Sequence, residues 1–154
     1  MSDYPTLLRK TYLDEARGDA FFGELESAQP DAQRREKLRT LQTVEARTAT
    51  SLRRLLADAG LKVDDARARQ EGRELAGQVD AADWNAVIRE LRGSFRHESA
   101  AVDQVRAAAP RPDDPAITAL ANHARAIERF VELESTGAAE QSLRALTDHL
   151  RRPA

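Results

Sequence analysis

The sequence predicts an all-α protein, a four-helix bundle with one long crossover connection and a short C-terminal helix. Ala, Leu, Arg and Glu dominate its 154 residues, which is a helix-forming composition, and no stretch alternates as a half-buried strand does. Proline and glycine divide the chain into blocks, and within each block apolar residues recur at spacings of three and four. The length is typical of one domain, so we expect residues 1–154 to form a single helical domain.

The first two helices are expected over residues 5–25 and 32–59. The turn at residues 27–31 separates them, and its last residue, Asp31, is a suitable N-cap for the second helix. Gly60 is placed to end the second helix in the left-handed conformation. Because this turn is short, the two helices should form an antiparallel hairpin.

The third and fourth helices are expected over residues 83–109 and 115–134, with the prolines at 110–112 as the break between them. They should form a second antiparallel hairpin, which completes a bundle over about residues 5–134. After a glycine, residues 139–150 are expected to form a short helix outside the bundle.

The connection between the two hairpins, residues 61–82, is long. It should carry a short helix after two consecutive aspartates, interrupted by Gly72 and Gly77. A connection of this length lets the chain return along the bundle before the third helix begins, which predicts one crossover rather than a simple up-and-down order.

Composition and charge exclude several classes of function. The chain has 24 Lys and Arg against 26 Asp and Glu, and this balance argues against a nucleic-acid-binding protein. It has no cysteine, which excludes disulfides, thiolate metal sites and thiol nucleophiles. The apolar runs are too short for a membrane span, and the N-terminus lacks a secretory signal pattern. We therefore expect a cytoplasmic protein that binds neither nucleic acid nor membranes.

Each apolar stripe is interrupted near its middle by an ionisable residue. Glu15 and Asp19 interrupt the first helix, Glu45 the second, Glu98 the third and His123 the fourth. Unpaired charges in a protein interior are strongly destabilising. A pattern that buries an ionisable residue on every helix therefore indicates that these residues have a specific role.

These interruptions lie at one level of the predicted bundle. Counted from the first turn, Glu15 is 14 residues back and Glu45 is 16 residues forward, which places them within roughly 3 Å along the helix axis. Counted from the second turn, Glu98 is 13 residues back and His123 is 12 residues forward. Since the two turns should lie at opposite ends, we expect three carboxylates and one imidazole in one central layer.

Carboxylates this close together cannot all stay ionised in a low-dielectric core. A bound metal ion is one way to stabilise them; shared protons, a buried arginine or a water-filled cavity are others. Oxygen ligands with one imidazole suit iron or manganese, and zinc less specifically. We therefore name Glu15, Glu45, Glu98 and His123 as candidate metal ligands, with Asp19, one turn from Glu15, as an auxiliary carboxylate.

With these residues, the chain resembles the ferritin-like superfamily over about residues 6–134, including rubrerythrin and other non-haem di-iron carboxylate proteins. In that family the first and third helices each supply a Glu, and the second and fourth each supply Glu-x-x-His. Glu15 and Glu98 match the single glutamates, Glu45 matches the Glu of the second helix, and His123 matches the His of the fourth.

Two of the six family positions differ: Thr48 stands in place of the second-helix His, and Leu120 in place of the fourth-helix Glu. The resemblance implies an iron or manganese site and, if the protein is an enzyme, a non-haem iron oxidoreductase that uses oxygen or peroxide. With an incomplete ligand set, a single-metal site, an altered dinuclear site and a remnant without metal all stay open, as do the substrate and catalysis itself.

The alternative is a metal-free bundle that acts through its surface as an interaction or assembly module. Leu13, Phe21 and Val44 are apolar but lie off the main stripes. They are expected either to form a homodimer interface or to be covered by the crossover or the last helix.

Overall fold

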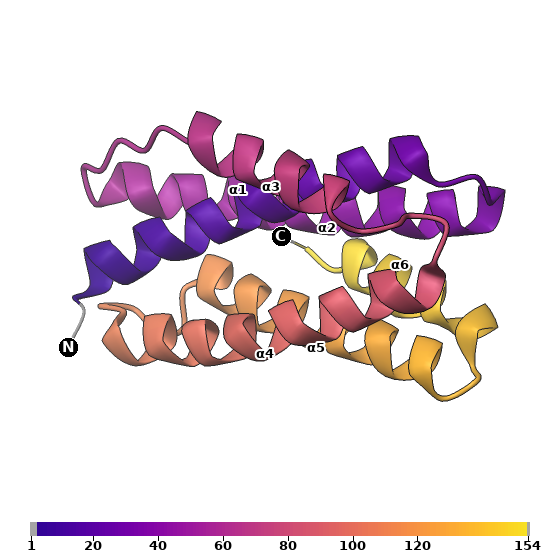
Figure 1. Cartoon of the computed structure of the whole chain (residues 1–154). Coiled ribbons are helices and arrows are strands. Elements are labelled where there is room, and N and C mark those ends of the chain that lie inside the picture. The colour runs from indigo at the N-terminus through magenta and orange to yellow at the C-terminus, as the bar shows by residue number, and fades with distance from the viewer. Residues whose placement is uncertain (1–2, 154) are drawn as a thin grey trace.

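A computed structural model describes residues 3–153, except for the side chain of Phe95, and this part of the chain is helical with no strand. Figure 1 shows the long helices side by side with the shorter ones packed against them. The all-α fold is confirmed, and the four long helices begin and end within three residues of the predicted bounds. The elements are α1 (Tyr4–Ala28), α2 (Ala32–Asp58), α3 (Ala66–Gly77), α4 (Trp84–Ala108), α5 (Pro115–Ser135), the 3-10 turn η1 (Ala139–Gln141) and α6 (Ser142–Arg151).

An aspartate caps the N-terminus of each long helix. Asp3, Asp31, Asp83 and Asp114 accept hydrogen bonds from backbone N–H groups of the first turn, at 2.9, 2.9, 3.2 and 2.9 Å. Each bond satisfies a donor that the helix leaves free, which is worth about 1 kcal/mol. Gly60 follows α2 with a φ of 71°, the left-handed conformation expected of it.

The connection between the hairpins returns along α1. At its start, the Tyr12 hydroxyl of α1 donates to the carboxylate of Asp65, just before α3, at 2.9 Å. At its end, the side-chain amide of Gln29, in the α1–α2 turn, donates to the carbonyl of Ala81, just before α4. Because α4 starts beside this turn, it runs antiparallel to α1, as a crossover connection requires (Figure 1).

Gly72 does not interrupt the crossover helix, and that expectation was wrong. The helix α3 continues through Gly72 and ends at Gly77. A Cβ atom at Gly72 would clash with the carbonyl of Arg17, so the glycine lets α3 pack directly on the backbone of α1.

The core is divided into two apolar clusters. One lies toward the α1–α2 turn and contains Leu38 and Phe130, and the other lies toward the opposite end and contains Leu8 and Ile117. Buried polar side chains fill the level between the clusters: Thr11, Glu15, Glu45, Thr48 and His123. A central polar layer is therefore present, and it contains three of the four residues expected there, Glu15, Glu45 and His123.

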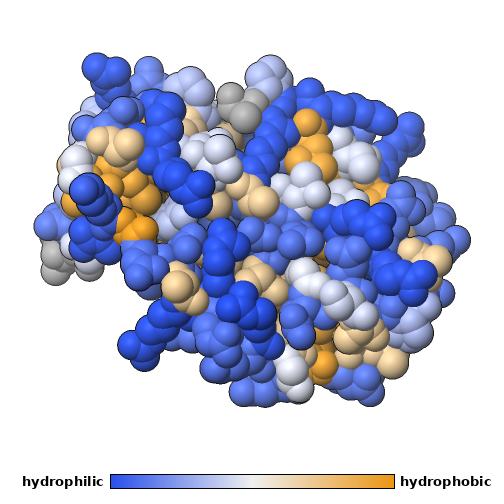
Figure 2. Space-filling view, turned by 90° about the horizontal axis from the view of Figure 1, so that it is seen from above, coloured by the Kyte–Doolittle hydropathy of each residue, from blue (hydrophilic) through white to orange (hydrophobic). Residues whose placement is uncertain are grey.

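The surface that the structure describes is largely polar. Leu75 is the one large hydrophobic residue there that is exposed, at 39%, and the face in Figure 2 is mainly hydrophilic with small separate apolar groups. Phe21 and Val44 are buried within the chain, and Leu13 is half-buried, so the first two are covered by its own helices. A homodimer stays a prediction. Among the described residues no helix is long and apolar enough to cross a membrane.

Candidate metal centre

Three of the predicted ligands meet between the two apolar clusters. Glu15 comes from α1, Glu45 from α2 and His123 from α5, with exposures of 2%, 3% and 1%. One ligand atom from each lies within 4.8 Å of the others. Glu15 Oε2 is 3.4 Å from His123 Nδ1, and Glu45 Oε1 is 3.5 Å from His123 Nε2. Counting helical rise from the turns therefore predicted this meeting correctly.

Thr48 fixes the imidazole of His123. The Thr48 hydroxyl donates to the Val44 carbonyl at 3.0 Å, one turn earlier in α2, so its oxygen is free to accept. His123 Nδ1 lies 2.6 Å from that oxygen and donates its proton to it. In the neutral imidazole, Nε2 then carries the lone pair, on the side of Glu45. An outer hydrogen bond of this kind is how proteins orient a histidine that binds metal.

Three atoms of the cluster lack a hydrogen-bond partner among the described residues. They are Glu15 Oε2, Glu45 Oε2 and His123 Nε2, all buried. A buried polar atom without a partner costs about 1–3 kcal/mol, and more when it is charged. All three atoms can donate an electron pair, and they belong to residues that each bring a donor atom within 4.8 Å of the others, so this donor set suits a cation.

Burial and the closeness of the acidic groups to one another change the pKa values of the cluster residues. Burial raises the pKa of Glu15 well above 4.5, and the Glu45 carboxylate beside it raises it further. Burial opposes protonation of His123, but the charge and hydrogen bonding of Glu45, together with the charge of Glu98, raise its pKa above 6.5. Without a cation, this interior therefore retains protons that an exposed site would release.

Glu98 lies at the edge of the cluster rather than within it. It is partly exposed on α4, and it lines both the open cleft beside Glu45 and a small cavity beside Glu15 and His123. Burial of its carboxyl and the nearby Glu45 charge raise the pKa of Glu98 to about 8, against a weaker effect of His123. The charges of Glu45 and His123 therefore affect the pKa of Glu98, but Glu98 is not one of the three groups that meet closely.

Asp19 is not brought to the cluster, and its expected role as an auxiliary ligand is not supported. One of its oxygens pairs with Arg69 of α3 at 2.9 Å, and the other accepts from Gln42 of α2 at 3.1 Å. The crossover helix supplies a cation on that side of α1, and the ion pair fully explains the acidic residue on the stripe.

His149 is a neighbour of the site that the sequence did not reveal. It is 8% exposed on α6, which packs against α5 and α2, and its ring lies edge-on to His123 with 6.4 Å between centroids. Burial, and then the charge of His123, lower the pKa of His149 to about 4, and its Nδ1 has no partner among the described residues. Its spacing of three from the buried Leu146 was the available signal.

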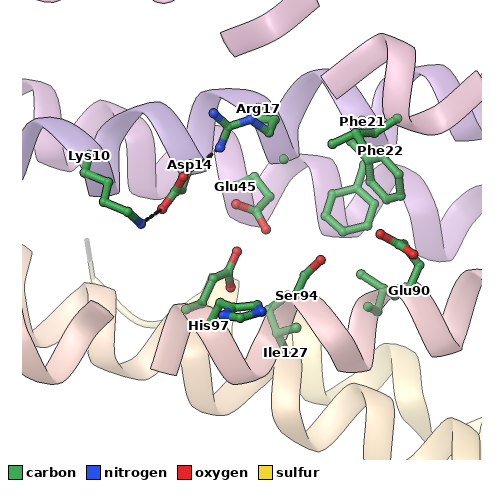
Figure 3. Close-up of a pocket in the computed structure, with 14 residues that line it drawn as sticks. Lys10, Asp14, Arg17, Phe21, Phe22, Glu45, Glu90, Ser94, His97 and Ile127 are labelled. Carbon is green, nitrogen blue, oxygen red and sulfur yellow. Dashed lines mark hydrogen bonds and ion pairs between the residues drawn. The ribbon is translucent and has the colours of Figure 1, made fainter. Parts of the chain in front are cut away.

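Gly18 keeps the cluster open to a cleft between α1 and α4. A Cβ atom at Gly18 would lie 2.9 Å from both Cδ and Oε2 of Glu45, closer than side chains approach. The Glu45 carboxylate points into the cleft in Figure 3, across from Ser94. Glu45 thus lies between the buried centre and this cleft.

No family model, curated protein or solved structure matches the chain. The ferritin-like resemblance therefore rests on the residues themselves. At its two divergent positions, Thr48 holds His123 and Leu120 is 1% exposed within an apolar cluster.

Proposed function

We propose that the protein is a ferritin-like metal-binding protein that holds one transition-metal ion, iron or manganese, at the cluster of Glu15, Glu45 and His123. The observation that carries this proposal is the meeting of three buried side chains from three separate helices, each with a donor atom within 4.8 Å of the others. Each of the three also has one buried atom without a hydrogen-bond partner among the described residues. Two carboxylates balance the charge of a divalent ion, and an imidazole with oxygen ligands matches the preference of these metals.

The supporting shell is consistent with this role. Thr48 holds the imidazole through Nδ1 and leaves Nε2 for the ion. Glu98, at the edge of the cluster, is placed to act as a further carboxylate for the ion or for a bound water. Iron would supply redox chemistry with oxygen or peroxide, and this is the reaction class we propose if the site is catalytic.

Metal loading tests the proposal directly. Purified protein is incubated with Fe(II) under anaerobic conditions, or with Mn(II), freed of excess ion and analysed for its metal content. We expect about one equivalent in the wild type and a loss in Glu45→Gln and His123→Ala, because a three-residue site does not tolerate removal of a ligand. Less than about a tenth of an equivalent of either metal in the wild type would refute the proposal.

A matched glycine pair tests the geometry without removing a ligand. Gly18→Ala places a methyl group against the Glu45 carboxylate, whereas Gly93→Ala, also within a long helix, meets open space. Displacing the support of a ligand costs roughly 10–100-fold in metal affinity, so Gly18→Ala should bind metal more weakly by about that factor and Gly93→Ala as tightly as wild type. Equal affinities would show that Glu45 is not a ligand.

A further inference from the structure

The cleft between α1 and α4 has the size of a site for one small molecule. It reaches from the surface to Glu45 and has a volume of about 240 Å³ (Figure 3). An apolar cavity of about 150 Å³ is enough to bind benzene, so the cleft has room for one ring with small substituents. It is smaller than the usual site for a drug-sized ligand, which limits the size of the molecule that it can enclose.

One end of the cleft is apolar. Toward the α1–α2 turn its walls are formed by Phe21, Phe22, Leu75, Leu91 and Ile127. The rings of Phe21 and Phe22 lie edge to face with centroids 5.3 Å apart, and Figure 3 shows the Phe22 ring facing the same space as the Glu45 carboxylate. Such walls favour a hydrocarbon ring, because they remove it from water and offer it a contact with an aromatic side chain.

Next to the apolar walls, two hydrogen-bonding groups face one another across the cleft. They are the carboxyl group of Glu45, on α2, and the hydroxyl group of Ser94, on α4 (Figure 3). Glu45 is 3% exposed, and its Oε2 has no hydrogen-bond partner among the described residues. Because Gly18 has no side chain, α1 leaves the Glu45 carboxyl uncovered on the cleft side. The position beside these two groups therefore suits a polar substituent of a bound ring.

A neutral hydroxyl group is the substituent that fits this position best. A hydroxyl both donates and accepts, so it can pair with Glu45 whether or not that carboxyl holds a proton. A carboxylate would find little attraction, because the Lys and Arg side chains that line the cleft, Lys10 and Arg17, already pair with Asp14 at 2.9 and 2.7 Å. Glu90 gives an ammonium group little advantage, since it is exposed and solvent screens its charge.

We infer that the cleft binds a small neutral molecule made of one apolar ring and a hydroxyl group, such as a phenol. The hydroxyl lies between Glu45 and Ser94, and the ring lies against Phe22 and Leu91. The volume limits the ligand to one ring, the apolar walls select its body, and the facing carboxyl and hydroxyl select its substituent. Leu75, 39% exposed on the same wall, gives the ring an apolar contact at the entrance. The inference goes beyond metal binding and does not depend on it.

Four ring compounds of similar size test the substituent: p-cresol, toluene, 4-methylbenzoate and 4-methylbenzylamine. Each is titrated at neutral pH into chelator-treated protein and followed by two-dimensional NMR; a phenol titrates near pH 10, so p-cresol is uncharged in this assay. We expect p-cresol to bind most tightly, about fivefold better than toluene because of its hydrogen bond and at least about tenfold better than 4-methylbenzoate. Toluene or either charged compound binding as tightly as p-cresol would overturn the inference.

A variant with a matched control locates the site. Ser94→Phe fills the cleft and should abolish p-cresol binding, whereas Gln104→Phe, exposed elsewhere on α4, should leave it unchanged. In the wild type, NOEs from the p-cresol ring to Phe22 and Leu91 are expected, and they locate the ligand even if Ser94→Phe fails to fold. Unchanged p-cresol binding in folded Ser94→Phe, or NOEs to neither side chain, would overturn the assignment.

Metal loading of ligand-free samples separates this inference from the proposed function. The p-cresol titration uses chelator-treated protein, so its outcome does not require a bound ion. Protein that binds p-cresol but takes up no metal would retain the cleft assignment and refute the metal site. Protein that takes up metal but does not bind p-cresol would do the reverse.

Discussion

The metal-free protein should lose stability as the pH rises, and Glu98 should account for a large part of the loss. The pKa of Glu98 in the folded protein is about 8, compared with an ordinary value of 4.5. Between these two pH values the folded protein retains a proton that the unfolded chain releases. The stabilisation is therefore complete below pH 4.5 and is lost as the pH rises through 8.

The size of the effect follows from the shift. A difference of about 3.5 pH units at about 1.4 kcal/mol per unit gives an upper limit of about 5 kcal/mol, and solvent screening of the partly exposed side chain reduces this to about 2 kcal/mol. The raised pKa of Glu15 and that of His123 act in the same direction. Because a domain is stable by only about 5–15 kcal/mol, a loss of this size is easily measured.

The assay is urea unfolding of chelator-treated protein from pH 5 to 8.5, followed by circular dichroism. Wild type should lose at least about 2 kcal/mol across this range, and Glu98→Gln, which cannot ionise there, should lose less by about that amount. Glu128→Gln, an exposed carboxyl on α5, is the control and should follow the wild type. A flat profile for the wild type, or identical profiles for wild type and Glu98→Gln, would refute the electrostatic reasoning.

Three further substitutions test individual contacts. Thr48→Val removes the hydroxyl that holds His123 and should weaken metal binding about 10–100-fold, with Thr48→Ser close to wild type; equal affinity of the valine and wild-type proteins in a metal titration would contradict this role. His149 is buried with a pKa of about 4, so its own contribution to stability, opposite in sign to that of Glu98, should fall as the pH drops from 6.5 to 4. Compared with wild type in urea unfolding, His149→Gln should therefore gain about 1–3 kcal/mol in relative stability over that drop, and no relative gain would mean the imidazole is hydrated. Gly72→Ala forces α3 away from α1 and should destabilise by about 1–3 kcal/mol, whereas Gly77→Ala meets open space, and thermal unfolding that finds the two equally stable would refute the close approach.

The heights of the cluster residues along the bundle could be predicted from the sequence, because they depend only on distance along a helix. Glu15, Glu45 and His123 meet because residues equally far from a turn lie at the same height, and the helical rise determines that height. The height of a residue does not determine, however, how far its side chain lies from the bundle axis. Glu98 has the right height but lies at the edge, because the packing of α4 against α1 leaves a cleft there.

The remaining differences came from elements whose packing the sequence pattern does not specify. The ion pair of Asp19, predicted as an auxiliary carboxylate one turn from Glu15, could not be foreseen, because its partner Arg69 belongs to the crossover helix and nothing in the pattern indicates which face of α1 that helix covers. The position of His149 beside the cluster could not be predicted, because the packing of the short last helix against α2 and α5 is a tertiary property. Local rules likewise identified Gly72 as a breaker, whereas its actual role is set by a neighbouring helix.

The polar layer between the two apolar clusters bears on how the molecule opens. All four long helices pass through both clusters, so each half of the bundle has its own hydrophobic interior, and buried polar side chains take the place of apolar packing at the seam between them. Occasional separation at that seam would expose backbone amides of both halves to exchange with solvent. An ion bonded to α1, α2 and α5 at the seam would suppress this opening, so ligation would slow amide exchange in both halves together rather than around the cluster alone.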